Sequence, residues 1–97
     1  MKIALRFTYD TDIIKVPKEY GTDAKKLQDQ FDKWLYDKNN DHGFWISKKG
    51  KYSGVTFNSD SFVDYLNNHV REEGWEKVTF IERKAQVIPK DIKVLYF

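Results

Sequence analysis

The sequence predicts an α+β fold of one domain, a two-layer sandwich in which two helices cover one face of a mostly antiparallel sheet. Three observations predict this class. Short runs of alternating apolar and polar residues are typical of half-buried strands. Two longer segments repeat apolar residues every three or four positions, as amphipathic helices do. The segments follow one another in the order ββαββαββ, which favours an antiparallel sheet with helices gathered on one side.

The N-terminal part of the chain predicts two strands. Residues 2–9 alternate between apolar and polar side chains, a polar turn follows at 10–12, and a second short strand spans 13–16. Pro17 ends that strand because proline lacks the N–H group that a strand ladder requires.

Residues 23–38 form the clearest helical segment. Thr22 or Asp23 can accept a hydrogen bond from a free N–H group of the first turn, and the charge of Asp23 suits the positive end of the helix dipole. The apolar stripe that this helix should bury consists of Ala24, Leu27, Phe31, Trp34 and Leu35.

A second helix is predicted after the polar run 58–61, which is rich in residues that cap helices. Its apolar stripe consists of Phe62, Val63, Leu66 and Val70, and Gly74 is placed to end it. Two further strands are expected at 75–83 and 92–97, joined by a polar link.

Residues 43–57 predict a hairpin between the two helices, because aromatic and β-branched runs flank a polar tip that contains glycine. A two-residue turn at Lys49 and Gly50 would pair Trp45 with Gly54 and point Trp45 away from the helices. A three-residue loop with Gly50 left-handed is the alternative, and it would shift the register by one residue. The grouping of apolar residues favours the two-residue turn.

Composition limits the class of protein. The 97 residues suffice for one modest core and predict a single domain, 1–97. Without cysteine there are no disulfides, thiolate metal sites or cysteine nucleophiles. No apolar run is long enough for a membrane span or a signal peptide, so a cytoplasmic location without membrane association is expected. The abundance of lysine over arginine, together with many Asn, Ile, Tyr and Phe residues, suggests an AT-rich bacterial or phage genome.

The stretch from Asp37 to Gly43 partly matches a calcium-binding loop. Asp37, Asn39 and Asp41 take its first, third and fifth positions, where carboxylate and amide oxygens bind hard cations. The glycine comes one position late, and Lys48 stands where the bidentate glutamate should be. We therefore expect a turn that follows a helix, with no metal and no cofactor.

The two histidines are the candidates for enzymatic chemistry. His42 adjoins Asp41, and His69 lies near Glu72 and Glu73, so either could serve in general acid–base catalysis. No nucleophile has a recognisable setting and no phosphate-binding glycine loop is present. An enzyme is therefore not expected, and a small enzyme with a His/Asp site stands as the third hypothesis.

The candidate binding site lies on the hairpin and consists of Trp45, Tyr52, Lys48, Lys49 and Lys51. Trp and Tyr are favoured anchors of protein interfaces, and lysines attract acidic partners. A sheet with one bare face must also hide that face or use it. We therefore expect a non-enzymatic protein-interaction module with an unknown protein partner. Single-stranded nucleic acid is the alternative partner, because aromatic rings beside lysines can stack on bases and contact phosphates, although the net charge is only +2.

Overall fold

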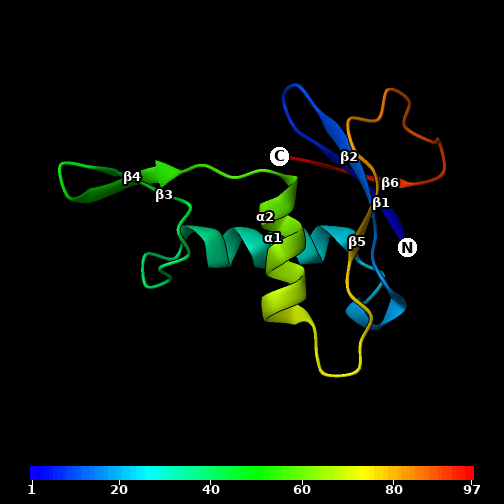
Figure 1. The fold of residues 1–97 in the computed structure, drawn as a ribbon, viewed down its shortest axis with the longest axis horizontal. Coiled ribbons are helices and arrows are strands. Elements are labelled where there is room, and N and C mark those ends of the chain that lie inside the picture. Colours follow the sequence, from blue (N-terminus) through cyan, green and yellow to red (C-terminus); the bar gives the residue numbers. More distant parts are fainter.

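Four strands form the main sheet of the computed structural model, which describes residues 1–97 (Figure 1). They are β1 (Lys2–Arg6), β2 (Thr11–Lys15), β5 (Thr79–Glu82) and β6 (Lys93–Tyr96). The strand order is β5-β2-β1-β6. The β1–β2 and β2–β5 pairs are antiparallel, whereas β1 and β6 run parallel. The sheet is therefore mostly antiparallel, as predicted.

The helices pack on one side of this sheet (Figure 1). They are α1 (Ala24–Tyr36), α2 (Ser59–Tyr65) and its π-helical continuation η2 (Leu66–Val70), and a short 3-10 turn, η1 (Lys18–Tyr20), precedes α1. The core joins side chains of the sheet to those of the helices; among the fully buried ones are Ile3, Leu5, Ile14, Val16, Phe31, Leu35, Phe62 and Leu66. The α+β class and the order ββαββαββ are confirmed. No helix combines the length and the apolar character that crossing a membrane requires.

The face of the sheet away from the helices is not bare. The strands β5 and β6 lie at opposite edges of the sheet, so the segment that joins them, 83–92, passes across it on the side opposite the helices (Figure 1). Two hydrogen bonds from backbone N–H groups hold its start: Lys84 N donates to the Asp12 side chain, at Oδ1, over 2.8 Å, and Ala85 N donates to the Thr11 carbonyl over 2.7 Å. Ala4 and Ile13 are buried there. The 83–92 segment therefore covers part of this face.

Both helices begin at caps that the sequence predicts, and of the two candidates for α1 it is Asp23 that caps the helix. The Asp23 carboxylate accepts from Lys26 N at 3.1 Å. At α2, Asn58 and Ser61 form a capping box, in which each side chain accepts from the other residue's backbone N–H.

The predicted end of the second helix at Gly74 is wrong. The helix ends at Val70, where a π-type hydrogen bond joins Arg71 N to the Leu66 carbonyl at 2.9 Å. The chain then turns back, and the Asn67 side chain pairs with both main-chain groups of Val78, at 2.8 and 3.0 Å. Gly74 lies in the following turn, with φ +88°. The helix stops early because Asn67 fixes the returning chain beside it.

The hairpin forms a sheet of its own. It consists of β3 (Trp45–Lys48) and β4 (Lys51–Val55), which pair only with each other and extend away from the body of the molecule (Figure 1). We call this hairpin the arm. The two-residue turn is present, and Lys49 and Gly50 both have positive φ, 54° and 77°, as in a type I′ turn.

The predicted pairing of Trp45 with Gly54 is wrong. The register follows the prediction near the turn, where Ser47 lies opposite Tyr52. It then shifts at an irregularity between Ile46 and Ser47, so that Ile46 faces Gly54 and Trp45 faces Val55. An extra residue on one strand of a hairpin has this effect. A Cβ atom added to Gly54 would meet no other atom within 4 Å, so no indole ring covers this glycine.

Candidate functional site

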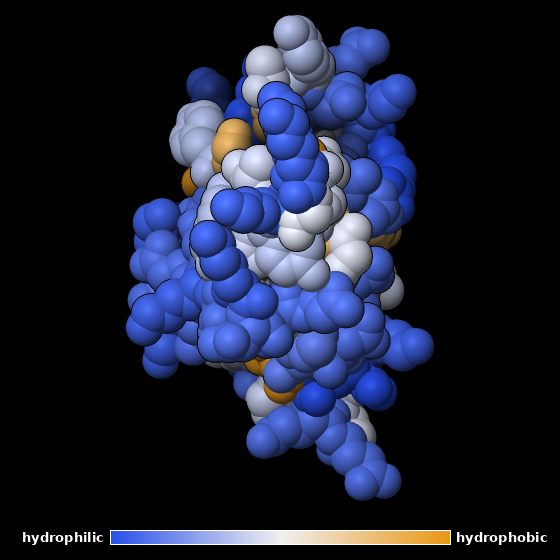
Figure 2. All heavy atoms as spheres, turned by 90° about the vertical axis from the view of Figure 1, so that its left-hand side faces the viewer, coloured by the Kyte–Doolittle hydropathy of each residue, from blue (hydrophilic) through white to orange (hydrophobic).

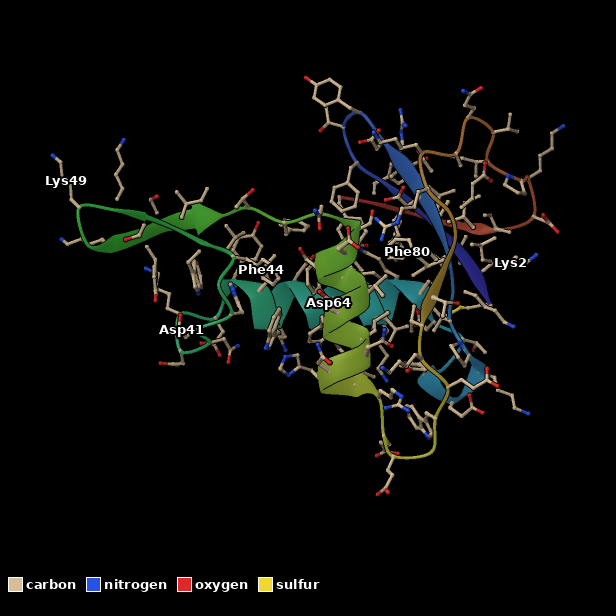
Figure 3. All side chains as sticks on the ribbon, viewed as in Figure 1. Lys2, Asp41, Phe44, Lys49, Asp64 and Phe80 are labelled. Carbon is tan, nitrogen blue, oxygen red and sulfur yellow. The ribbon has the colours of Figure 1, made fainter.

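The three lysines of the predicted site lie together at the tip of the arm. Lys48 and Lys51 are paired across the hairpin, and Lys49 stands in the turn, farthest from the body (Figure 3). All three are exposed and none forms a salt bridge. Like charges held directly opposite each other destabilise a strand pair slightly and attract an anion. The tip is therefore a free cationic surface.

The two aromatic residues of the predicted site stack on each other behind this tip. The rings of Trp45 and Tyr52 are nearly parallel, with centroids 4.9 Å apart and an interplanar angle of 11°. Tyr52 is 41% exposed, whereas Trp45 is half-buried. Such a pair contributes about 0.5–1.5 kcal/mol beyond the burial of its area.

Both faces of the Trp45 indole are covered. Tyr52 is paired with Ser47, on the tip side of Trp45, and His42 precedes Trp45 on the side of the body. The His42 ring also stacks on the indole, at 5.1 Å and 15°. The indole N–H donates to the Asn40 carbonyl over 2.7 Å. Trp45 is therefore held between two rings of the chain itself, and these contacts fix the base of the arm.

His42 connects the arm to the end of α1 through both ring nitrogens. Nδ1 accepts from Phe44 N over 3.1 Å, so the proton resides on Nε2, which donates to the Leu35 carbonyl over 2.7 Å. The ring also packs against Trp34, with centroids 4.7 Å apart. Because both nitrogens are engaged with the backbone, His42 has no free position for acid–base chemistry.

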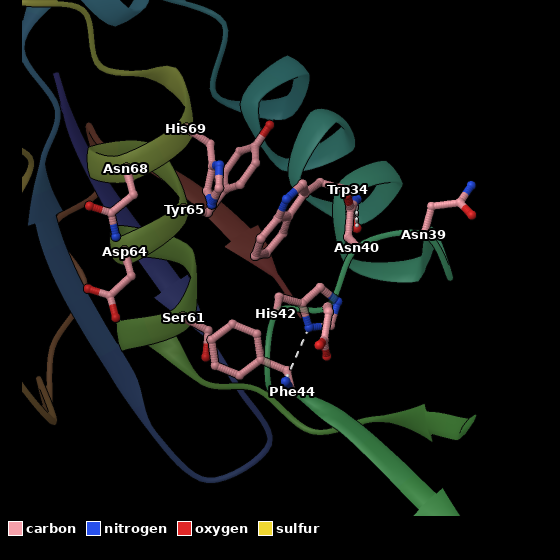
Figure 4. A pocket seen from close by; sticks show the side chains of 11 residues that line it. Trp34, Asn39, Asn40, His42, Phe44, Ser61, Asp64, Tyr65, Asn68 and His69 are labelled. Carbon is pink, nitrogen blue, oxygen red and sulfur yellow. Dashed lines mark hydrogen bonds between the residues drawn. The ribbon is translucent and has the colours of Figure 1, made fainter. Parts of the chain in front are cut away.

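A cleft of about 370 Å³ opens beside this histidine, between α2–η2 and the loop that follows α1 (Figure 4). It is lined by Trp34, Asn39, Asn40, Asp41, His42, Phe44, Ser61, Asp64, Tyr65, Asn68 and His69. The rings of Trp34, Tyr65 and His69 pack together, with centroids 4.8–5.7 Å apart. Burial raises the pKa of the Tyr65 phenol, which therefore stays a neutral donor. The cleft combines an aromatic lining with polar and acidic residues.

Some polar side chains of the cleft have a partner within the chain and others do not. Ser61 belongs to the capping box, and the Asn40 amide donates to the Trp34 carbonyl over 2.9 Å. The carboxylates of Asp41 and Asp64 instead form neither a salt bridge nor a side-chain hydrogen bond. The ring of His69 is likewise without a hydrogen bond. No lysine or arginine lines the cleft.

The loop after α1 forms the turn that the sequence predicts. The Asp37 side chain accepts from Asn39 N over 3.0 Å, and the Asp37 carbonyl accepts from Asn40 N over 3.0 Å. The structure brings no group of three His, Asp or Glu side chains into a metal-binding arrangement. His69 points into the cleft, whereas Glu72 and Glu73 do not line it.

The apolar stripe of the first helix includes Trp34, and Tyr65 lies outside the predicted stripe of the second helix, yet both residues line the cleft. The sequence does contain a pattern that marks the side of the second helix facing the cleft. Ser61, Tyr65 and His69 recur every four residues, so they share one side of the helix. The contribution of the 39–42 loop had no such signal, because a loop has no periodicity.

Comparisons with known protein families, with curated protein sequences and with solved structures each found no match. The case for a function therefore depends on the arm and the cleft themselves.

Proposed function

We propose that this chain is a non-enzymatic protein-interaction module that binds an acidic protein partner through the arm. The observation that carries the proposal is the left-handed backbone of Lys49, φ 54°, at the tip of a projecting hairpin. Asparagine or glycine would adopt this conformation at lower cost than lysine. A locally unfavourable residue beside two more unpaired lysines supports a role in which charge at this position is needed.

The residues of the arm have different roles in this proposal. Lys48, Lys49 and Lys51 attract the acidic partner and orient it. Tyr52 offers the outer face of its ring as an anchor. Trp45 is a positioning residue, since both faces of its ring are covered by the chain.

The surface around the arm supports a charged contact more than an apolar one. Figure 2, which views the molecule from the end of the arm, shows hydrophilic atoms over most of this face and only small, separate apolar areas. Ile46 is 46% exposed on the arm and adds one apolar contact. Polar surfaces of this kind suit a partner that binds reversibly.

Fluorescence anisotropy with a short labelled peptide of alternating Glu and Thr tests the proposal. The wild-type chain should bind it with an affinity that falls as salt rises. Reversing the three arm lysines to Glu should weaken binding by about tenfold or more and remove most of the salt dependence. The matched control is reversal of Lys18, Lys77 and Lys90, which are exposed elsewhere and should matter far less. Equal losses in both triple variants would contradict the proposal.

Single-stranded nucleic acid is the second candidate partner. The three lysines and the exposed ring of Tyr52 favour it, because aromatic stacking and phosphate contacts are its usual recognition mode. Trp45 cannot contribute a stacking face to a base, which leaves Tyr52 alone for that role. A labelled thymidine oligonucleotide of matched charge decides between the candidates. Binding of the oligonucleotide well above that of the peptide, and its loss in Tyr52→Ala, would favour nucleic acid.

A further inference from the structure

We propose that the cleft between α2–η2 and the loop after α1 binds an organic cation, a guanidinium or alkylammonium group. The arm and the cleft are separate surfaces of opposite charge, so this site goes beyond the proposed function of the arm. Figure 3 shows the separation: Asp41 and Asp64 lie near the body, whereas Lys49 lies at the far end of the arm.

The charges of the cleft select for a cation. Asp41 on the loop and Asp64 on α2 line its two sides, and neither carboxylate has an ionic partner in the chain. No lysine or arginine among the lining residues offsets them, although the whole chain carries a net charge of +2. A local negative potential within a positively charged protein favours a cationic ligand over a neutral or anionic one.

The rings and amides of the cleft suit the rest of such a ligand. Trp34, Tyr65 and Phe44 provide aromatic surface, which attracts cations and packs against the methylene groups of an arginine or lysine side chain. The amide groups of Asn39 and Asn68 offer further acceptors. A volume of about 370 Å³ is at the small end of ligand pockets and admits one side chain or one small amine.

The structural supports of the cleft leave its ligand-binding groups free. His42, Asn40 and Ser61 bind the backbone or cap α2, so they fix the shape of the cleft. The free groups are the two carboxylates, the two other asparagine amides and His69. Aromatic rings beside hydroxyl-binding amides also suit a neutral sugar, but two unpaired carboxylates favour the cation.

Isothermal titration with N-acetyl-arginine amide and N-acetyl-citrulline amide tests the proposal. The two compounds have nearly the same shape, and only the arginine derivative carries a charged guanidinium. We expect the arginine derivative to bind at least about tenfold more tightly. Asp41→Asn and Asp64→Asn should each weaken its binding by about tenfold, because each removes one charge-assisted contact without changing size.

Asp91→Asn is the matched control, since it makes the same change of charge at an exposed position outside the cleft. It should leave the affinity for the arginine derivative within about twofold of wild type.

The same titration with agmatine and with a capped glycine peptide that contains one arginine distinguishes the source of the guanidinium group. Tighter binding of the peptide indicates a side chain of a partner, and tighter binding of agmatine indicates a free amine.

Three results would overturn the proposal. One is equal affinity for the arginine and citrulline derivatives, and another is tighter binding of a disaccharide such as maltose. The third is an arginine affinity that Asp64→Asn and Asp91→Asn reduce by the same factor. None of these results bears on the arm, which is probed with acidic ligands.

Discussion

At the scale of single residues, a few side chains hold the backbone together by binding it at two points. His42 joins the carbonyl of Leu35 to the N–H group of Phe44, and Asn67 pairs with both main-chain groups of Val78. Each ties an irregular segment to a helix. Such groups are costly to remove, because the backbone atoms that they leave behind lack a partner.

His42→Phe keeps an aromatic ring between Trp34 and Trp45 but loses both hydrogen bonds. We expect a loss of about 1–3 kcal/mol in the free energy of unfolding and faster amide exchange at Phe44. Urea unfolding and hydrogen exchange measure the two effects. His69→Phe is the control, since His69 is exposed and forms no hydrogen bond. Comparable losses in the two variants would mean that His42 acts only by stacking.

Asn67→Ala should destabilise the chain by about 2–3 kcal/mol, because the N–H and carbonyl groups of the buried Val78 lose their partners. The neighbouring change Asn68→Ala, at an exposed residue, should stay within about 0.5 kcal/mol of wild type. Thermal or urea unfolding of both variants gives the comparison. A loss of stability in Asn67→Ala as small as that in Asn68→Ala would show that water replaces the side-chain amide at the backbone groups of Val78.

At the scale of elements, the sequence indicated which segments form helices and strands better than it indicated where they end. The strongly periodic α1 and its Asp23 cap were predictable, because both depend on local chemistry. The end of η2 was not, because a contact with the returning chain at Val78 decides it. The turn of the arm was predictable, but the shift of register beyond Ser47 leaves no mark in the sequence.

The turn of the arm itself gives a prediction about stability. Lys49→Asn should stabilise the chain by on the order of 0.5–1 kcal/mol, because asparagine tolerates positive φ better than lysine. The same change should also weaken binding of the acidic peptide, because it removes one positive charge from the arm. Gly50→Ala should have the opposite effect on stability, since Gly50 has φ 77°. Thermal unfolding of both variants is the measurement, and a Lys49→Asn variant less stable than wild type would exclude backbone strain at this position.

The contact between α2 and the segment after β5 predicts a dependence on pH. Arg83 donates two hydrogen bonds to Asp60, at 2.6 and 3.0 Å, and they hold the pKa of the Asp60 carboxyl below its ordinary 3.8. Since the native pKa is the lower one, the pair adds stability above pH 3.8 and loses it as the pH falls through the native pKa.

Arg83→Gln should therefore be less stable than wild type at neutral pH, by a small amount because the pair is exposed. The difference should vanish as the pH falls through the lowered native pKa of the Asp60 carboxyl. Urea unfolding at a series of pH values measures it. In an Asp60→Asn background, Arg83→Gln should cause no pH-dependent loss, and a loss that persists there would point to the contact of Arg83 with the Phe80 ring instead.

At the scale of the whole molecule, the two candidate surfaces are held on one frame. A series of ring contacts runs from Tyr52 through Trp45 and His42 to Trp34; the first two contacts are stacked and the last is tilted, and together they connect the arm to the lining of the cleft. The sequence predicted the residues of the arm but not the contact of His42 with Trp45, because His42 reaches that ring through an irregular loop. The cleft as a whole was not predictable, since it forms between two segments far apart in the chain.

Chemical-shift mapping of backbone amides during titration with the Glu-Thr peptide tests the binding role of the arm most directly. We predict that the largest shifts fall on residues 45–55, and that reversal of the three arm lysines to Glu abolishes them while the spectrum of the main sheet stays unchanged. Smaller shifts should reach His42, which stacks on Trp45. Shifts centred on the four-stranded sheet or on the 83–92 segment, and kept in the lysine variant, would contradict the account.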